Sequence, residues 1–139
     1  MRGTFATTDR KHNSRRGIAA TEFAVCAPIL VLLVLATMET ASMIFLQQSL
    51  TIASYEATRI ALVPGALDAN VKYQAELILT GRGVKNPTVT VTPSDIAGAA
   101  PGTWLNITSS AKYSDNALMG GWIFNGRTLS ATVRMMKER

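Results

Sequence analysis

The strongest pattern along the chain is one run of apolar residues, 23–46, which contains a single ionisable residue, Glu39. Lysine and arginine are absent from Gly17 to Thr58. The hydrocarbon core of a bilayer is about 30 Å thick and needs roughly 20 helical residues to cross it. The run supplies this length and lacks the Ala-x-Ala site that ends a secretory signal peptide. It therefore predicts a transmembrane helix.

The helical pattern continues beyond the apolar run. Small or apolar residues recur at three- and four-residue spacing up to Ala61, which is typical of a helix with one covered face. Pro64 and Gly65 then favour an end at about Val63, because proline blocks continuation and glycine suits the turn. Pro28 lacks a backbone N–H, so we expect a kink near the start of the apolar run. The recurring residues are Leu46, Leu50, Ala53, Ala57, Ile60 and Ala61.

The remainder of the chain predicts a small α+β domain. A short helix is expected from a capping Asp68 to about Leu79, stopped by Gly81 and Gly83, with Val71, Ala75 and Ile78 on one side. Alternating or β-branched residues predict strands at Thr88–Thr92, Thr103–Thr108 and Thr128–Met136, with a loop over Asp95–Gly102. We expect a three- or four-stranded antiparallel sheet that packs on the outer half of the long helix. The predicted fold class is α+β: a long N-terminal transmembrane helix followed by a small antiparallel sheet domain.

The charge distribution predicts how the chain is oriented. The first seventeen residues hold five Lys/Arg and one acid, which gives +4, while the rest holds nine Lys/Arg and eight acids, which gives +1. Basic residues next to an apolar run follow the positive-inside rule, so the N-terminus is expected in the cytoplasm. A nucleic-acid partner is not expected, because its binder would spread basic residues over a folded face. The predicted organisation is a basic leader (1–17), a membrane-spanning and extended helix (18–64) and an exported domain (65–139).

Candidate chemistry is sparse, and we expect neither an enzyme nor a cofactor. His12 is the single histidine and lies in the leader, which disfavours His-based catalysis or metal binding. No nucleotide-binding motif and no small-molecule site is evident. Cys26 has no second cysteine for a disulfide, and we expect it to behave as a buried apolar residue. The apolar patch Met119–Phe124 is read as core in preference to a partner surface.

Two carboxylates lie in or beside the apolar run. For Glu22, one interpretation is an interfacial acid that favours the helix dipole. The other is that cleavage after Gly17 creates an α-amino group on Ile18, with which Glu22 of a neighbouring subunit could pair. For Glu39, a snorkelling or protonated acid near the outer interface and a helix–helix contact in an oligomer remain equal alternatives.

The segment from Arg15 to Ala24 resembles the processing region of type IV prepilins, with basic residues, a glycine, four residues and a glutamate. It is still more similar to the TadE-like pseudopilins of the tight-adherence (Tad/Flp) pilus system. The features that carry this resemblance are Gly17, Glu22-Phe23-Ala24, Pro28, Glu39 and Arg59, with a weaker likeness in the final strand, Leu129–Met135.

The resemblance implies a minor pilin or pseudopilin that takes part in pilus assembly and surface adherence. It implies cleavage of the Gly17–Ile18 bond by a prepilin peptidase, and helix or assembly contacts at Glu22, Pro28, Glu39 and Arg59. The implied partners are the membrane, the peptidase, other pilin subunits and the Tad secretion machinery. The implied location is the bacterial inner membrane, with passage into a surface pilus after processing. The alternative is an unprocessed single-pass anchor that carries an extracytoplasmic binding module.

Overall fold

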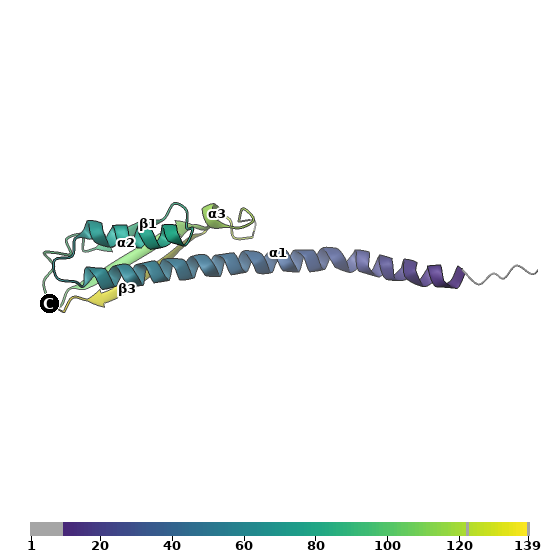
Figure 1. Ribbon diagram of the computed structural model, residues 1–139, viewed down its shortest axis with the longest axis horizontal. Coiled ribbons are helices and arrows are strands. Elements are labelled where there is room, and N and C mark those ends of the chain that lie inside the picture. Colours follow the sequence, from purple (N-terminus) through teal and green to yellow (C-terminus); the bar gives the residue numbers. More distant parts are fainter. Residues whose placement is uncertain (1–9, 122, 139) are drawn as a thin grey trace, which may run out of the picture. The chain divides into compact units, whose positions relative to one another are not determined.

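The computed structural model describes residues 10–121 and 123–138, with side chains from Gly17 onward (Figure 1). Its longest element is α1, a 52-residue helix over Arg10–Ala61. The helix begins before Ile18, where the sequence predicted its start, and it ends two residues before Val63. Pro28 lies inside α1, and the helix continues on both sides of it. Residues 10–16 of the predicted leader are therefore helical.

The chain divides into two compact units, Met1–Thr37 and Met38–Arg139. In the first unit, the side chains of α1 from residue 18 onward are almost all exposed, and we call residues 18–37 the anchor segment. The hydroxyls of Thr21 and Thr37 each donate a 2.7 Å hydrogen bond to a carbonyl of the preceding turn. Threonine can satisfy its hydroxyl in this way inside a helix, so these side chains need no outside partner.

The second unit, which we call the head, contains the rest of α1 and a three-stranded antiparallel sheet of order β1-β2-β3. This architecture confirms the predicted α+β class, and the bounds of β1 and β3 agree with the sequence prediction. β2 begins one residue later than expected and extends four residues further, and α3 was not predicted. The elements after α1 are α2 (Asp68–Gly81), β1 (Thr88–Thr92), β2 (Trp104–Lys112), α3 (Tyr113–Asn116) and β3 (Thr128–Met136).

One face of the sheet forms the core with α1 and α2. Strict alternation along β1 and β2 buries Val89, Val91, Leu105 and Ile107, while their threonine and asparagine neighbours face outward. This alternation is the expected pattern for a sheet that is covered on one side only. The helices supply the other half of the core: Leu46, Leu50, Ala53, Ala57 and Ala61 from α1, and Val71, Ala75 and Leu79 from α2.

A buried polar contact fixes α1 on the sheet. Ser54 is fully buried, and its Oγ accepts the backbone N–H of Ser109 at 3.1 Å. The same Oγ lies 2.9 Å from Ser109 Oγ and 3.0 Å from the carbonyl oxygen of Ala131. Because a buried hydroxyl without a partner is costly, these contacts favour one register of α1 on β2 and β3.

The ends of α2 agree only in part with the sequence prediction. Asp68 is not the cap: Leu67 occupies that position without a side-chain hydrogen bond, and Asp68 instead pairs with Lys72 at 2.7 Å in the first turn. An acid here still favours the helix dipole. At the other end, Gly83 has φ +73°, and the N–H of Val84 bonds the carbonyl of Leu79 at 2.9 Å. This is a Schellman motif, so Gly83 ends the helix as predicted, whereas Gly81 is the last residue of α2 itself.

Candidate functional site

Glu39 is the best-defined candidate site residue in the structure. It is 2% exposed, although it lies on α1 directly after the anchor segment. The hydroxyl of Tyr113 donates a 2.9 Å hydrogen bond to the backbone carbonyl of Glu39. The backbone N–H of Ile123 donates a 3.3 Å hydrogen bond to carboxylate Oε1. The head itself therefore covers Glu39.

The segment that covers Glu39 is positioned by the end of the sheet. β2 ends at Lys112, and the single turn of α3 directs Tyr113 inward, where it is fully buried. The ring of Phe124 meets the Tyr113 ring edge-on, with centroids 5.9 Å apart and planes at 82°. This is a favoured aromatic geometry. It ties the loop after α3 to the core beside Glu39, and we call the described residues of this loop, 117–121 and 123–127, the tip loop.

Burial also sets the protonation of Tyr113. Desolvation raises its pKa above the ordinary value of 10.0, and the nearby charge of Glu39 acts in the same direction. A hydrogen bond with Ser42 opposes the shift. A buried phenol is held neutral in this way, because the phenolate would lose its hydration. Tyr113 therefore remains a hydrogen-bond donor to α1 over the physiological pH range.

The structure adds a contact that neither sequence interpretation of Glu39 included. The sequence suggested a snorkelling or protonated acid near the outer interface or a helix–helix contact in an oligomer, and the structure places the side chain against the chain's own tip loop. The two partners lie 74 and 84 residues away in the sequence. A local pattern holds no signal for such a contact. A role for Glu39 in assembly stays a prediction.

The other predicted site residues lie apart along α1. Gly17, Ile18, Glu22 and Pro28 are all exposed in the first unit. Arg59, in the head, is exposed and pairs with Glu56 of the preceding helical turn at 3.1 Å. An exposed pair of this kind contributes about 0–1 kcal/mol. Ile18 and Glu22 lie one turn apart on the same face of α1, and within the described residues no hydrogen bond or ion pair joins the side chains of any two of these residues.

Two expectations about apolar residues need correction. Cys26 is exposed in the chain, because no other part of the first unit covers that stretch of α1. In the apolar patch 119–124, Met119 and Ile123 are 46% and 45% exposed, so the core interpretation is wrong for them. Phe124 is half-buried and does pack against the core. Trp122 lies outside the described residues.

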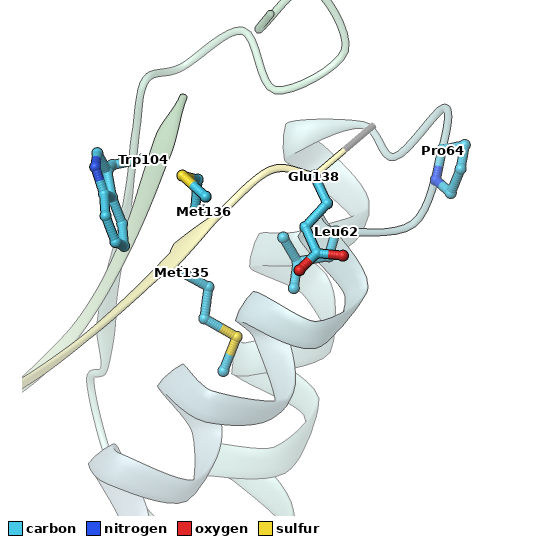
Figure 2. A pocket seen from close by; sticks show the side chains of 6 residues that line it. All are labelled: Leu62, Pro64, Trp104, Met135, Met136 and Glu138. Atoms are coloured by element: carbon cyan, nitrogen blue, oxygen red, sulfur yellow. The ribbon is translucent and has the colours of Figure 1, made fainter. Parts of the chain in front are cut away.

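A cavity of about 550 Å³ lies where the C-terminal end of α1 meets the ends of β2 and β3 (Figure 2). Trp104 and Met136 are register partners on these strands, and the guanidinium of Arg134 lies 4.4 Å from the centre of the Trp104 ring. The lining is mostly apolar and offers no catalytic pair of side chains. Within the described residues, no group of three His, Cys, Asp or Glu side chains is arranged to hold a metal. The lining residues are Leu62, Pro64, Trp104, Met135, Met136 and Glu138.

Fold and surface together define a class: an α+β protein whose described residues include one candidate membrane-spanning helix, Gly17–Ala61. Residues 17–59 match the family model of TadE-like proteins. This match confirms the family resemblance of the N-terminal motif, and it indicates an association with Tad pilus systems. The match ends inside α1, so the sheet lies outside the matched residues. No curated protein and no solved structure matches the chain.

Proposed function

We propose that this chain is a minor pilin or pseudopilin of a Tad-type pilus, with a structural role in pilus assembly and surface adherence and no enzymatic activity. The observation that carries the proposal is the TadE-like match over residues 17–59, which starts at Gly17 and includes the whole anchor segment. The exposed surface of that segment supports it. An apolar helix without cover in its own chain needs lipid, and after extraction it needs the helices of other subunits.

The proposed location is the bacterial inner membrane, with the N-terminus in the cytoplasm and the head outside. The supporting observation is the charge distribution, since the first seventeen residues hold a net +4 and the rest of the chain a net +1. Basic residues near the end of a membrane helix favour the cytoplasmic side. The head then lies on the side from which a pilus grows.

The proposed processing step is hydrolysis of the Gly17–Ile18 peptide bond by a prepilin peptidase. Water is added across the amide, which leaves a carboxylate on Gly17 and an α-amino group on Ile18. This bond lies inside α1 in the structure, and a glycine at its N-terminal side lowers the local helix preference by about 1 kcal/mol relative to alanine. Glycine therefore favours local unwinding at the cleavage site.

Mass spectrometry of the membrane-bound protein, with and without the peptidase, tests the processing step. The expected mature N-terminus is Ile18, and we expect Gly17→Arg to block cleavage. No heavy atom lies within 4 Å of the Cβ that a substitution at Gly17 would add, so the first side-chain atom meets open space. Asn13→Arg adds the same charge outside the motif and should be cut normally. Cleavage of Gly17→Arg at the native rate would refute the proposed site.

Glu22 has a proposed role in assembly after cleavage. Its carboxylate is exposed and forms no ion pair with another side chain in the described part of the chain. It is thus available to pair with the Ile18 α-amino group of a neighbouring subunit, where each charge neutralises the other in an apolar surrounding. We expect Glu22→Gln to spare cleavage and to reduce incorporation into pili, measured by immunoblots of sheared filaments. Normal incorporation of this variant would contradict the ion pair.

The alternative function is an uncut anchor that carries an extracytoplasmic binding module. The observation that favours it is the unbroken helix from Arg10 through Ala61, which leaves the Gly17–Ile18 bond in a helical conformation. Recovery of the full-length chain from membranes that contain active peptidase would support this alternative. Recovery of the processed chain in sheared pili would exclude it.

A further inference from the structure

Exposed apolar side chains of the head gather around the contact between the tip loop and α1. In the tip loop, Leu118, Met119 and Ile123 are 66%, 46% and 45% exposed. On the adjoining turns of α1, Met38 and Phe45 are 43% and 49% exposed. A groove of about 430 Å³ lies between Leu118 of the tip loop and α1, lined by Met38, Ala41, Ser42, Phe45, Asn116 and Leu118. A continuous exposed apolar surface of this kind marks an interaction site.

The tip loop is held in place by polar contacts at its base. The side-chain amide of Asn116 donates to the carbonyls of Lys85 and Lys112, and its oxygen accepts the Lys85 N–H at 2.7 Å. The N–H of Ile123 is bonded to Glu39. These bonds anchor Asn116, which precedes the exposed residues Leu118 and Met119, and the backbone of Ile123, which follows them.

The turns of α1 that adjoin the tip loop lie in the outer half of the apolar run 23–46, which the sequence predicts to cross the membrane. From Ile18 to Met38 there are 21 residues (38 − 18 + 1), which extend about 32 Å at 1.5 Å per residue. This length equals the thickness of a bilayer core, about 30 Å, so a span that begins at Ile18 ends next to Glu39, the residue to which the tip loop is bonded. A span of the same length that begins at Phe23 ends at Met43, still on the turns of α1 beside the tip loop.

Cationic side chains beside the apolar surface fit the same location. The guanidinium of Arg82 lies 5.1 Å from the centre of the Phe45 ring, and that of Arg127 lies 5.7 Å from the centre of the Phe124 ring. Arginine next to aromatic and aliphatic side chains is typical of proteins that rest in the headgroup region of a bilayer. Lipid phosphates would complement both charges.

We propose that the tip loop is a second membrane contact, which seats Leu118, Met119 and Ile123 in the headgroup–acyl boundary of the leaflet from which α1 emerges. This contact rests on the membrane anchoring in the proposed function. It holds the head on the bilayer surface before extraction, in addition to the tether that α1 provides. Extraction into a filament would then have to detach the tip loop from lipid as well as withdraw the anchor segment.

Quenching by nitroxide-labelled lipids tests this proposal on the full chain in liposomes. An environment-sensitive fluorophore is attached to a single cysteine at Leu118→Cys, Leu32→Cys or Thr132→Cys, each in a Cys26→Ser background. Leu32 reports the anchor segment, and Thr132 reports the exposed face of the sheet. We expect blue-shifted emission and strong quenching at positions 32 and 118, and unshifted, unquenched emission at position 132.

Each other outcome overturns a defined part of the account. Quenching at position 32 without quenching at 118 refutes the tip-loop contact and leaves the membrane anchor intact. Blue-shifted emission at 118 that nitroxide lipids do not quench, and that grows with the protein-to-lipid ratio, assigns the surface to a second copy of the chain and refutes lipid as its partner. Absence of quenching at both positions refutes the membrane anchor together with the tip-loop contact.

Discussion

The two parts of α1 have the same secondary structure but opposite surfaces. In the anchor segment, the large residues Ile29 to Val34 are 53–59% exposed. In the head, the stripe from Leu46 to Ala61 is at most 3% exposed, and it consists of leucine at one end and alanine at the other. An apolar helix surface without protein cover requires another apolar solvent, whereas a narrow stripe of small residues allows a sheet to approach closely. A helix that is apolar on all sides therefore indicates an apolar solvent, and a helix that is apolar on one side indicates packing against a sheet.

The largest difference between the two parts of α1 is expected in head stability, when a leucine is replaced by alanine in the head and, separately, in the anchor segment. Leu50→Ala, at a fully buried position, should destabilise the head by about 2–5 kcal/mol, because it removes packed atoms and leaves a cavity. Leu32→Ala, at a position 53% exposed, should change head stability by less than about 0.5 kcal/mol. Denaturant unfolding of the full chain in detergent, followed by tryptophan fluorescence, measures both. Equal effects would contradict the division of α1.

An arginine introduced in each part tests which part of α1 lies in the membrane. Leu32→Arg should raise the free energy of membrane insertion by about 2.5–3.5 kcal/mol, because the guanidinium would lie in hydrocarbon. Ile52→Arg is the matched control, since Ile52 lies on the exposed side of α1 in the head at 42% exposure. This variant should insert like the native chain. A translocation reporter fused to the C-terminus measures both, and a similar loss of insertion at position 52 would place the head half of α1 in the membrane.

A smaller effect is expected at the contact that joins the head to Glu39. Tyr113→Phe removes the hydrogen bond to the Glu39 carbonyl and should cost about 0.5–1.5 kcal/mol of head stability. Tyr73→Phe, at an exposed position in α2, should cost almost nothing. Urea unfolding at neutral pH compares the two variants. If Tyr113→Phe were neutral as well, the hydroxyl would have no role in holding the tip loop.

The pH dependence of the head follows from the same residue. The folded-state pKa of Tyr113 is raised above 10.0, so the unfolded state loses its proton at lower pH than the folded state. The stability that this residue contributes is therefore complete below about pH 10 and is lost as the pH rises through the folded-state pKa. Tyr113→Phe should flatten this alkaline loss. An unchanged alkaline limb of the stability profile in the variant would assign the loss to other groups.

Much of the fold follows from local sequence patterns. The alternation of Thr88–Thr92 predicts β1 with its bounds, and the spacing from Leu46 to Ala61 predicts the covered side of α1. The end of β2 did not follow, because Ser109-Ser110-Ala111-Lys112 has little intrinsic strand preference. Pairing with β1 and β3 makes it a strand, which illustrates that strand formation depends on its neighbours. A four-residue helix such as α3 is too short for a periodic signal.

The candidate site divides in the same way. Gly17 and Glu22 could be identified from the sequence, because their spacing forms a compact local motif at the start of an apolar run. The surroundings of Glu39 could not, because its hydrogen-bond partners come from Tyr113 and Ile123 at the far end of the head. The apolar surface of the tip loop was also missed, since a short apolar stretch has the same composition in a core and on a surface. Only the folded contacts separate these cases.

Labelling with a membrane-impermeant maleimide in spheroplasts tests the central claim most directly: α1 crosses the membrane with its anchor segment and carries the head outside. The chain is expressed with Cys26→Ser and one new cysteine, either Leu32→Cys or Tyr55→Cys, both exposed positions of α1. We predict that position 55 reacts in intact spheroplasts and that position 32 reacts only after detergent is added. Reaction at position 32 without detergent, or reaction at position 55 only after lysis, would contradict the account.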